Sequence, residues 1–167
     1  MVLGMSLATF TLAHVIISLI AIVAGIVVMF GMFGSDRMRG LTAIFLLFTV
    51  LTNATGFLFP FEGFKPSYVI AALSLVLLAI ACIALYGMKL SGAWRWIYVM
   101  TALLSLYFNV FVLVIQSFLK IPGLTALAPG NPPSGPVFAA VQGIVLLFFV
   151  IVVVGAVRRF RPVPAFG

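Results

Sequence analysis

The sequence predicts an all-α integral membrane bundle of five transmembrane helices, with the N-terminus outside and the C-terminus in the cytoplasm. Of the 167 residues, 65% are hydrophobic and only 7% are charged. The apolar residues form five long runs separated by short polar segments. A soluble domain covers its surface with far more charge than this. A bilayer accepts such runs, because about 20 apolar residues in a helix cross its hydrocarbon core.

The five runs give the boundaries of the expected spans, which together form a single domain over residues 1–167. The spans are residues 8–33, 41–59, 67–88, 94–119 and 137–157. Each is roughly twice the length of a membrane β-strand or longer, and none alternates as a barrel strand does. We expect helices, because a helix satisfies its own backbone hydrogen bonds in lipid.

Each boundary coincides with a local signal. The first span ends at a polar turn with two arginines, residues 34–40, and the second ends at Pro60. Ser67 follows Pro66 and is a plausible N-cap for the third span. The fourth begins at Trp94, after a basic turn. The fifth follows the proline-rich segment 120–136, which we expect to lie on the outer side.

The positive charges predict the orientation of the bundle. Five crossings place seven of the nine Lys and Arg residues on one side: Arg37, Arg39, Lys89, Arg95, Arg158, Arg159 and Arg161. Only Lys65 and Lys120 fall on the other side. The positive-inside rule then assigns the seven to the cytoplasm, here of a bacterial inner membrane. Trp94 and Trp96 flank Arg95, a combination typical of membrane-interface anchors.

The excess of basic over acidic residues, with a pI of about 10.4, also suggests nucleic-acid binding as a function. We exclude a nucleic-acid partner, because the basic residues cluster at the ends of apolar runs rather than along a groove. In those positions they attract anionic lipid headgroups, so the expected partner is the cytoplasmic surface of the bilayer.

Five polar side chains inside the expected spans are candidates for a ligand site: His14, Asn53, Asn109, Gln116 and Gln142. Most of them lie at similar depth in the outer half of their helices. If their faces converge, they form a neutral polar pocket open to the outside. The alternative is that they serve as interhelical hydrogen bonds, which average about 0.6 kcal/mol each. Both interpretations stay open at this stage.

His14 is the only histidine and Cys82 the only cysteine. A single histidine cannot supply two axial haem ligands, so haem would need a second subunit. No metal site is predicted. His14 could instead contact a quinone, or hydrogen-bond within the bundle. The spans contain no carboxylate, which argues against a pump or a coupled transporter.

Three segments resemble a family of small uncharacterised bacterial inner-membrane proteins, mostly from proteobacteria. They are residues 52–61, 92–98 and 106–122. The resemblance covers most of the chain and implies no biochemical activity. Asn53, Gly56, Asn109, Gln116 and Lys120 lie within these segments, and three of them are candidate ligand residues.

The expected function is that of a non-catalytic integral inner-membrane protein. It would act as an accessory or scaffolding subunit, or bind a small neutral ligand in the outer leaflet. Other membrane subunits or further copies of the chain are the expected protein partners, and no cofactor is predicted. One alternative is a subunit of a membrane oxidoreductase that contacts quinone or haem through His14. Another is a passive transporter or channel lined by the polar side chains.

Overall fold

The computed structural model describes residues 1–60, 63 and 66–163, and these residues form helices without any β-strand. The elements are α1 (Leu7–Phe33), α2 (Arg39–Gly56), α3 (Pro66–Cys82), the π-helical turn η1 (Ile83–Gly87), α4 (Trp94–Lys120), the short α5 (Pro122–Leu127) and α6 (Pro136–Arg159). The all-α prediction is confirmed. Lys65, one of the two cations expected on the outer side, lies outside the described residues.

Four of these segments are long and apolar enough to cross a membrane. They are α1, α3 together with η1 (Pro66–Gly87), α4 and α6, with 22 to 27 residues each. The protein is therefore suited to a membrane by the length and composition of its helices. The helix α2 is not among the four: it has 18 residues, begins with Arg39 and carries several polar side chains, namely Thr42, Thr49, Thr52, Asn53 and Thr55.

When α3 and η1 are taken as one continuous helical segment, the helix ends differ little from the predicted spans, and the largest difference is at the end of α2. The predicted span runs to residue 59, whereas the helix ends at Gly56. The backbone N–H groups of Phe57 and Leu58 bond to the carbonyls of Ala54 and Thr55, three residues back, at 3.2 and 3.1 Å. These tighter bonds close the last turn before Pro60.

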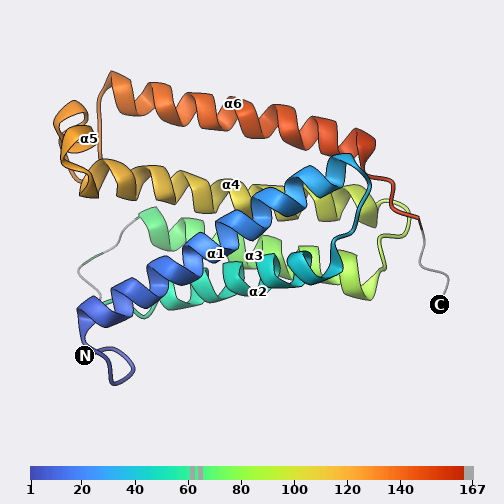
Figure 1. Ribbon diagram of the computed structural model, residues 1–167, viewed down its shortest axis with the longest axis horizontal. Helices are drawn as coiled ribbons and strands as arrows, with labels where there is room; N and C mark the ends of the chain where they lie inside the picture. The colour runs from blue at the N-terminus through green and yellow to red at the C-terminus, as the bar shows by residue number, and fades with distance from the viewer. Residues whose placement is uncertain (61–62, 64–65, 164–167) are drawn as a thin grey trace.

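The central helix of the bundle is α4, which contacts α1, α2, α3 and α6. In Figure 1, α6 runs beside α4, and α5 lies at the end where the chain passes from one to the other. The core between the helices contains large side chains that solvent or lipid does not reach, among them Met29, Phe45, Tyr98 and Leu106. Because Gly25 on α1 has no side chain, Phe45 of α2 and Leu106 of α4 pack closely against its backbone.

The helix α6 is the least buried of the four long apolar helices, with 17% of its most apolar stretch buried. Only Phe149, Val152 and Ala156 are buried on it, while Ile144, Leu147 and Ile151 are 60 to 69% exposed. A soluble monomer rarely leaves so much contiguous apolar surface in water. Lipid, or a neighbouring membrane helix, is the surrounding that matches this surface.

The connections gather at the two ends of the bundle. The turn between α1 and α2, the turn before α4 and the segment after α6 lie at one end, and α5 and the N-terminus lie at the other (Figure 1). The first end carries Arg37, Arg39, Lys89, Arg95, Arg158, Arg159 and Arg161, whereas Lys120 is at the second. We refer to the first as the basic end.

Candidate functional site

Two of the five candidate residues, Asn53 and Asn109, meet in the core between α2, α3 and α4. The Nδ2 group of Asn53 donates to the Thr49 carbonyl at 2.8 Å and to Ser74 Oγ of α3 at 3.1 Å. Asn109 Nδ2 of α4 donates to Thr49 Oγ1 at 3.5 Å. Thr49 and Ser74 are fully buried and the two asparagines nearly so. This hydrogen-bond network connects three helices.

His14 lies apart from that network, at the contact between α1 and α2. Its Nδ1 is 2.7 Å from Thr55 Oγ1. The Thr55 hydroxyl also lies 2.7 Å from the Leu51 carbonyl, to which it donates its only proton. The tautomer in which His14 Nδ1–H donates to Thr55 satisfies both contacts of this hydroxyl and leaves the lone pair on Nε2. The imidazole packs edge-on against Phe59, with ring centroids 5.2 Å apart.

Gln142 lies at a third place, the contact between α6 and α4. Gln142 Nε2 donates to the backbone carbonyl of Phe111 at 3.1 Å. Its Oε1 is buried and has no hydrogen-bond partner in the part of the chain that the structure describes. Gln116 is exposed on α4. The structure brings Asn53 and Asn109 together, whereas His14 and Gln142 make separate contacts and Gln116 is exposed. The five candidates therefore do not share one pocket.

The basic end contains an arrangement that the sequence prediction did not include. Arg95, expected as an interface anchor, donates from Nη1 to the backbone carbonyls of Val157 at 2.9 Å and Phe160 at 2.6 Å. Ser35, in the turn before α2, donates to the Arg159 carbonyl at 2.8 Å and accepts from the Arg161 N–H at 2.9 Å. We call these four hydrogen bonds the C-terminal clasp.

The clasp gives Arg95 a different role from the other predicted anchors. A guanidinium that binds the last carbonyls of a helix compensates the negative end of its dipole. Trp96 is exposed and Trp94 is half-buried. Arg158 and Arg159 end α6 in its last turn. The sequence signal for the clasp was weak, because Arg95 and Phe160 are 65 residues apart.

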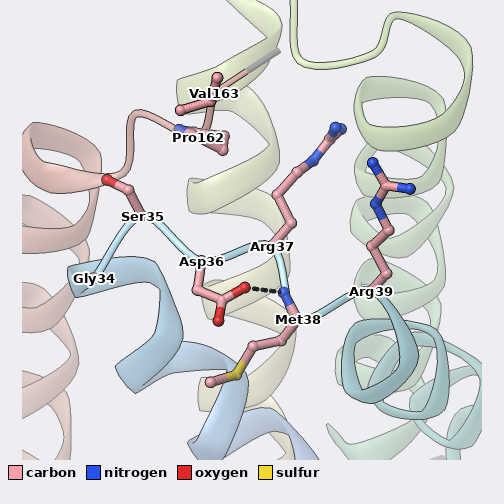
Figure 2. Close-up of a pocket in the computed structure, with 8 residues that line it drawn as sticks. All are labelled: Gly34, Ser35, Asp36, Arg37, Met38, Arg39, Pro162 and Val163. Atoms are coloured by element: carbon pink, nitrogen blue, oxygen red, sulfur yellow. Dashed lines mark hydrogen bonds between the residues drawn. The ribbon is translucent and has the colours of Figure 1, made fainter. Parts of the chain in front are cut away.

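None of the five candidate residues lines either of two cavities found on the surface of the described part of the bundle. One has a volume of about 540 Å³ and lies at the basic end; Gly34, Ser35, Asp36, Arg37, Met38, Arg39, Pro162 and Val163 line it (Figure 2). The other, of about 340 Å³, is lined only by apolar side chains of α1, α4 and α6. We call the first the basic cavity.

Among the described residues, no three His, Cys, Asp or Glu side chains lie close enough together to hold a metal ion. Comparison of this chain with protein families, with curated proteins and with solved structures finds no match. The resemblance to small bacterial inner-membrane proteins stays a prediction. The function must therefore be inferred from the geometry described above.

Proposed function

We propose that this chain is a non-catalytic integral protein of the bacterial inner membrane that acts as an accessory or scaffolding subunit. The observation that carries this proposal is the use of the polar side chains. Asn53 and Asn109 are buried in hydrogen bonds between helices, and Gln142 donates to the backbone of α4. Side chains committed to such contacts fix the register of the helices.

The same packing makes a passive channel less suitable than a scaffold. A channel needs polar side chains that face a path for water or solute. Thr49, Ser74 and Ser105, which belong to the polar faces of α2, α3 and α4, have 0% exposure. Their hydroxyl groups donate or accept within the bundle. The interior of this region is packed and hydrogen-bonded.

We further propose that α2 is a fifth crossing, with the basic end in the cytoplasm. The polar side chains of α2 make it less apolar than the other long helices, but Thr42, Thr49 and Asn53 face the interior of the bundle, where they are buried. Polar groups that pack against neighbouring helices avoid contact with lipid. The N-terminus and the C-terminal end of α6 lie at opposite ends of the bundle (Figure 1), and the positive-inside rule supports a cytoplasmic basic end.

Labelling of single cysteines with a membrane-impermeant maleimide tests this topology. In a Cys82→Ala background, we expect Leu3→Cys and Leu127→Cys to react in cells whose outer membrane has been permeabilised. Ser91→Cys and Val163→Cys should react only after the inner membrane is opened as well. All four positions are exposed. Reaction of Leu3→Cys and Val163→Cys from the same side would contradict five crossings.

The oxidoreductase alternative has one observation in its favour. In the tautomer whose Nδ1–H donates to Thr55, Nε2 of His14 has a lone pair and no hydrogen-bond partner in the described parts of the chain. Such a nitrogen could bind a haem iron or accept a hydrogen bond from a quinol hydroxyl.

Purification in a mild detergent separates the scaffold from this alternative. We expect the chain to elute as a complex larger than its monomer, with no Soret absorbance and no stoichiometric quinone in the lipid extract. The His14→Ala variant should have the same spectrum and the same extract. A stoichiometric haem or quinone that is lost in His14→Ala would replace our proposal with the oxidoreductase subunit. A monomer without any partner would contradict a scaffolding role.

A further inference from the structure

The basic cavity contains two cations without anionic partners. Arg37 and Arg39 both line it, and neither makes a side-chain hydrogen bond or an ion pair with any residue that the structure describes. Arg37 is half-buried. Arg95 differs from both, because backbone carbonyls of the C-terminal clasp satisfy its guanidinium group. A half-buried guanidinium without an acceptor is costly unless an anion or water completes its hydrogen bonds.

The turn before α2 holds the two arginines on the same side. Met38 adopts a left-handed backbone conformation, with φ 37°, and its N–H donates to Asp36 Oδ1 at 2.9 Å. Its side chain packs against α1 so closely that a Cβ atom on Gly31 would lie 2.7 Å from the Met38 sulfur. Figure 2 shows that Met38 points toward α1, while Arg37 and Arg39 extend together in the opposite direction.

The opposite wall of the cavity is held in place by the C-terminal clasp. Pro162 and Val163 form this wall, and they directly follow Arg161, whose N–H donates to Ser35. Ser35 belongs to the same turn as the two arginines. The two walls are therefore connected by hydrogen bonds, and the cavity exists before any ligand enters. A preformed site spares a ligand the cost of ordering it.

The net charge of the cavity lining indicates the charge of the ligand that it favours. Arg37 and Arg39 contribute +2 and Asp36 contributes −1, so the lining carries a net charge of +1. The Asp36 carboxylate is turned toward the Met38 N–H rather than toward the guanidinium groups (Figure 2). The positive end of the α2 dipole, which begins at Arg39, adds to the attraction for an anion. This balance favours a singly charged anion with several acceptor oxygens.

We propose that the basic cavity binds a phosphate group through Arg37 and Arg39. The planar guanidinium fork matches the oxygens of a phosphate, and the volume of about 540 Å³ has room for a phosphodiester headgroup. The inference rests on the proposed membrane location, which puts the basic end at the headgroup level. A phospholipid headgroup and a soluble phosphate share this chemistry, and the experiment below distinguishes them.

Titration of the detergent-purified protein with three probes tests the proposal. The probes are short-chain phosphatidylglycerol, short-chain phosphatidylcholine and inorganic phosphate. The double variant Arg37→Gln/Arg39→Gln should raise the Kd for phosphatidylglycerol by about tenfold or more. Lys89→Gln/Arg158→Gln removes the same charge from two exposed positions of the basic end that do not line the cavity. This control should change the Kd by less than about twofold.

Each outcome either distinguishes a lipid headgroup from a soluble phosphate or contradicts a phosphate site in the basic cavity. Arginine-dependent binding of phosphatidylglycerol supports a lipid headgroup. If only inorganic phosphate binds with the same dependence, the site takes a soluble phosphate. Equal losses in the two double variants, or no binding of any probe to the wild type, overturn the proposal. Arg37→Lys/Arg39→Lys should bind more weakly than the wild type but more tightly than the glutamine variant, which excludes misfolding as the cause. Because the titration is done in detergent, its result does not depend on the orientation of the bundle.

Discussion

The Gly25→Leu variant is expected to lose about 3 kcal/mol of unfolding free energy, because it overfills the contact between α1, α2 and α4. A Cβ atom at residue 25 would lie 2.6 Å from Leu106 Cδ1 and 2.8 Å from two ring carbons of Phe45. Both neighbours have 0% exposure, so neither side chain can move aside without displacing other core residues. The helices would have to separate at their most crowded crossing.

Gly143→Leu is the matched control for this substitution. It makes the same change on α6, where a Cβ atom would have no neighbour within 4 Å. Both variants gain the same helix propensity, so the difference between them reports packing alone. Unfolding in mixtures of detergent and sodium dodecyl sulfate, followed by the fluorescence of Trp94 and Trp96, measures both. Equal midpoints for the two variants would contradict the packing of α1 described here.

The helices could be predicted from the sequence because lipid leaves few alternatives to a long apolar run. The all-α class and the helix boundaries follow from run length and from local signals such as Pro60 and Pro66. The α2 helix differs from the other long helices because its polar face lowers its hydropathy, although Asn53 and Thr49 on that face are buried. Burial of that face against α3 and α4 is a property of the tertiary structure, and hydropathy alone does not report it.

The arrangement of the polar side chains could be predicted only in part. Asn109 and Gln116 lie seven residues apart on one face of α4, yet Asn109 is buried and Gln116 is exposed. The difference arises because Asn109 packs against α2, as its bond to Thr49 shows. Spacing along one helix gives a shared face, but it does not say how far a neighbouring helix covers that face. Ser74, the partner of Asn53, had no distinguishing pattern of its own.

At the basic end, the sequence pattern does not distinguish the contacts of the individual arginines, because those contacts are long-range. The arginines near residues 37, 95 and 159 all match the pattern of interface anchors. Arg95 nevertheless binds the end of α6, and Arg37 and Arg39 line a cavity. Both roles depend on the path of the chain after α6, and the residues that meet there are 62 to 126 positions apart in the sequence.

Phe160 holds the segment after α6 against the bundle. The Phe160→Ala variant is expected to lose about 3 kcal/mol of unfolding free energy. Phe160 is 1% exposed, and its ring packs against Tyr98 with centroids 5.9 Å apart. Truncation leaves a cavity beside Tyr98 and removes the packing that presents the Phe160 carbonyl to Arg95. The C-terminal clasp should therefore open at lower denaturant than the rest of the bundle.

Phe30→Ala provides the comparison, because Phe30 is 63% exposed on α1. In a membrane its ring contacts lipid in both the folded and the unfolded chain, so truncation should cost well under 1 kcal/mol. Hydrogen exchange of the Arg161 N–H, which donates to Ser35, separates a local from a global effect. Faster exchange in Phe160→Ala at unchanged protection of α4 would mean that the clasp opens by itself. Unchanged exchange at that N–H would show that the clasp does not depend on Phe160.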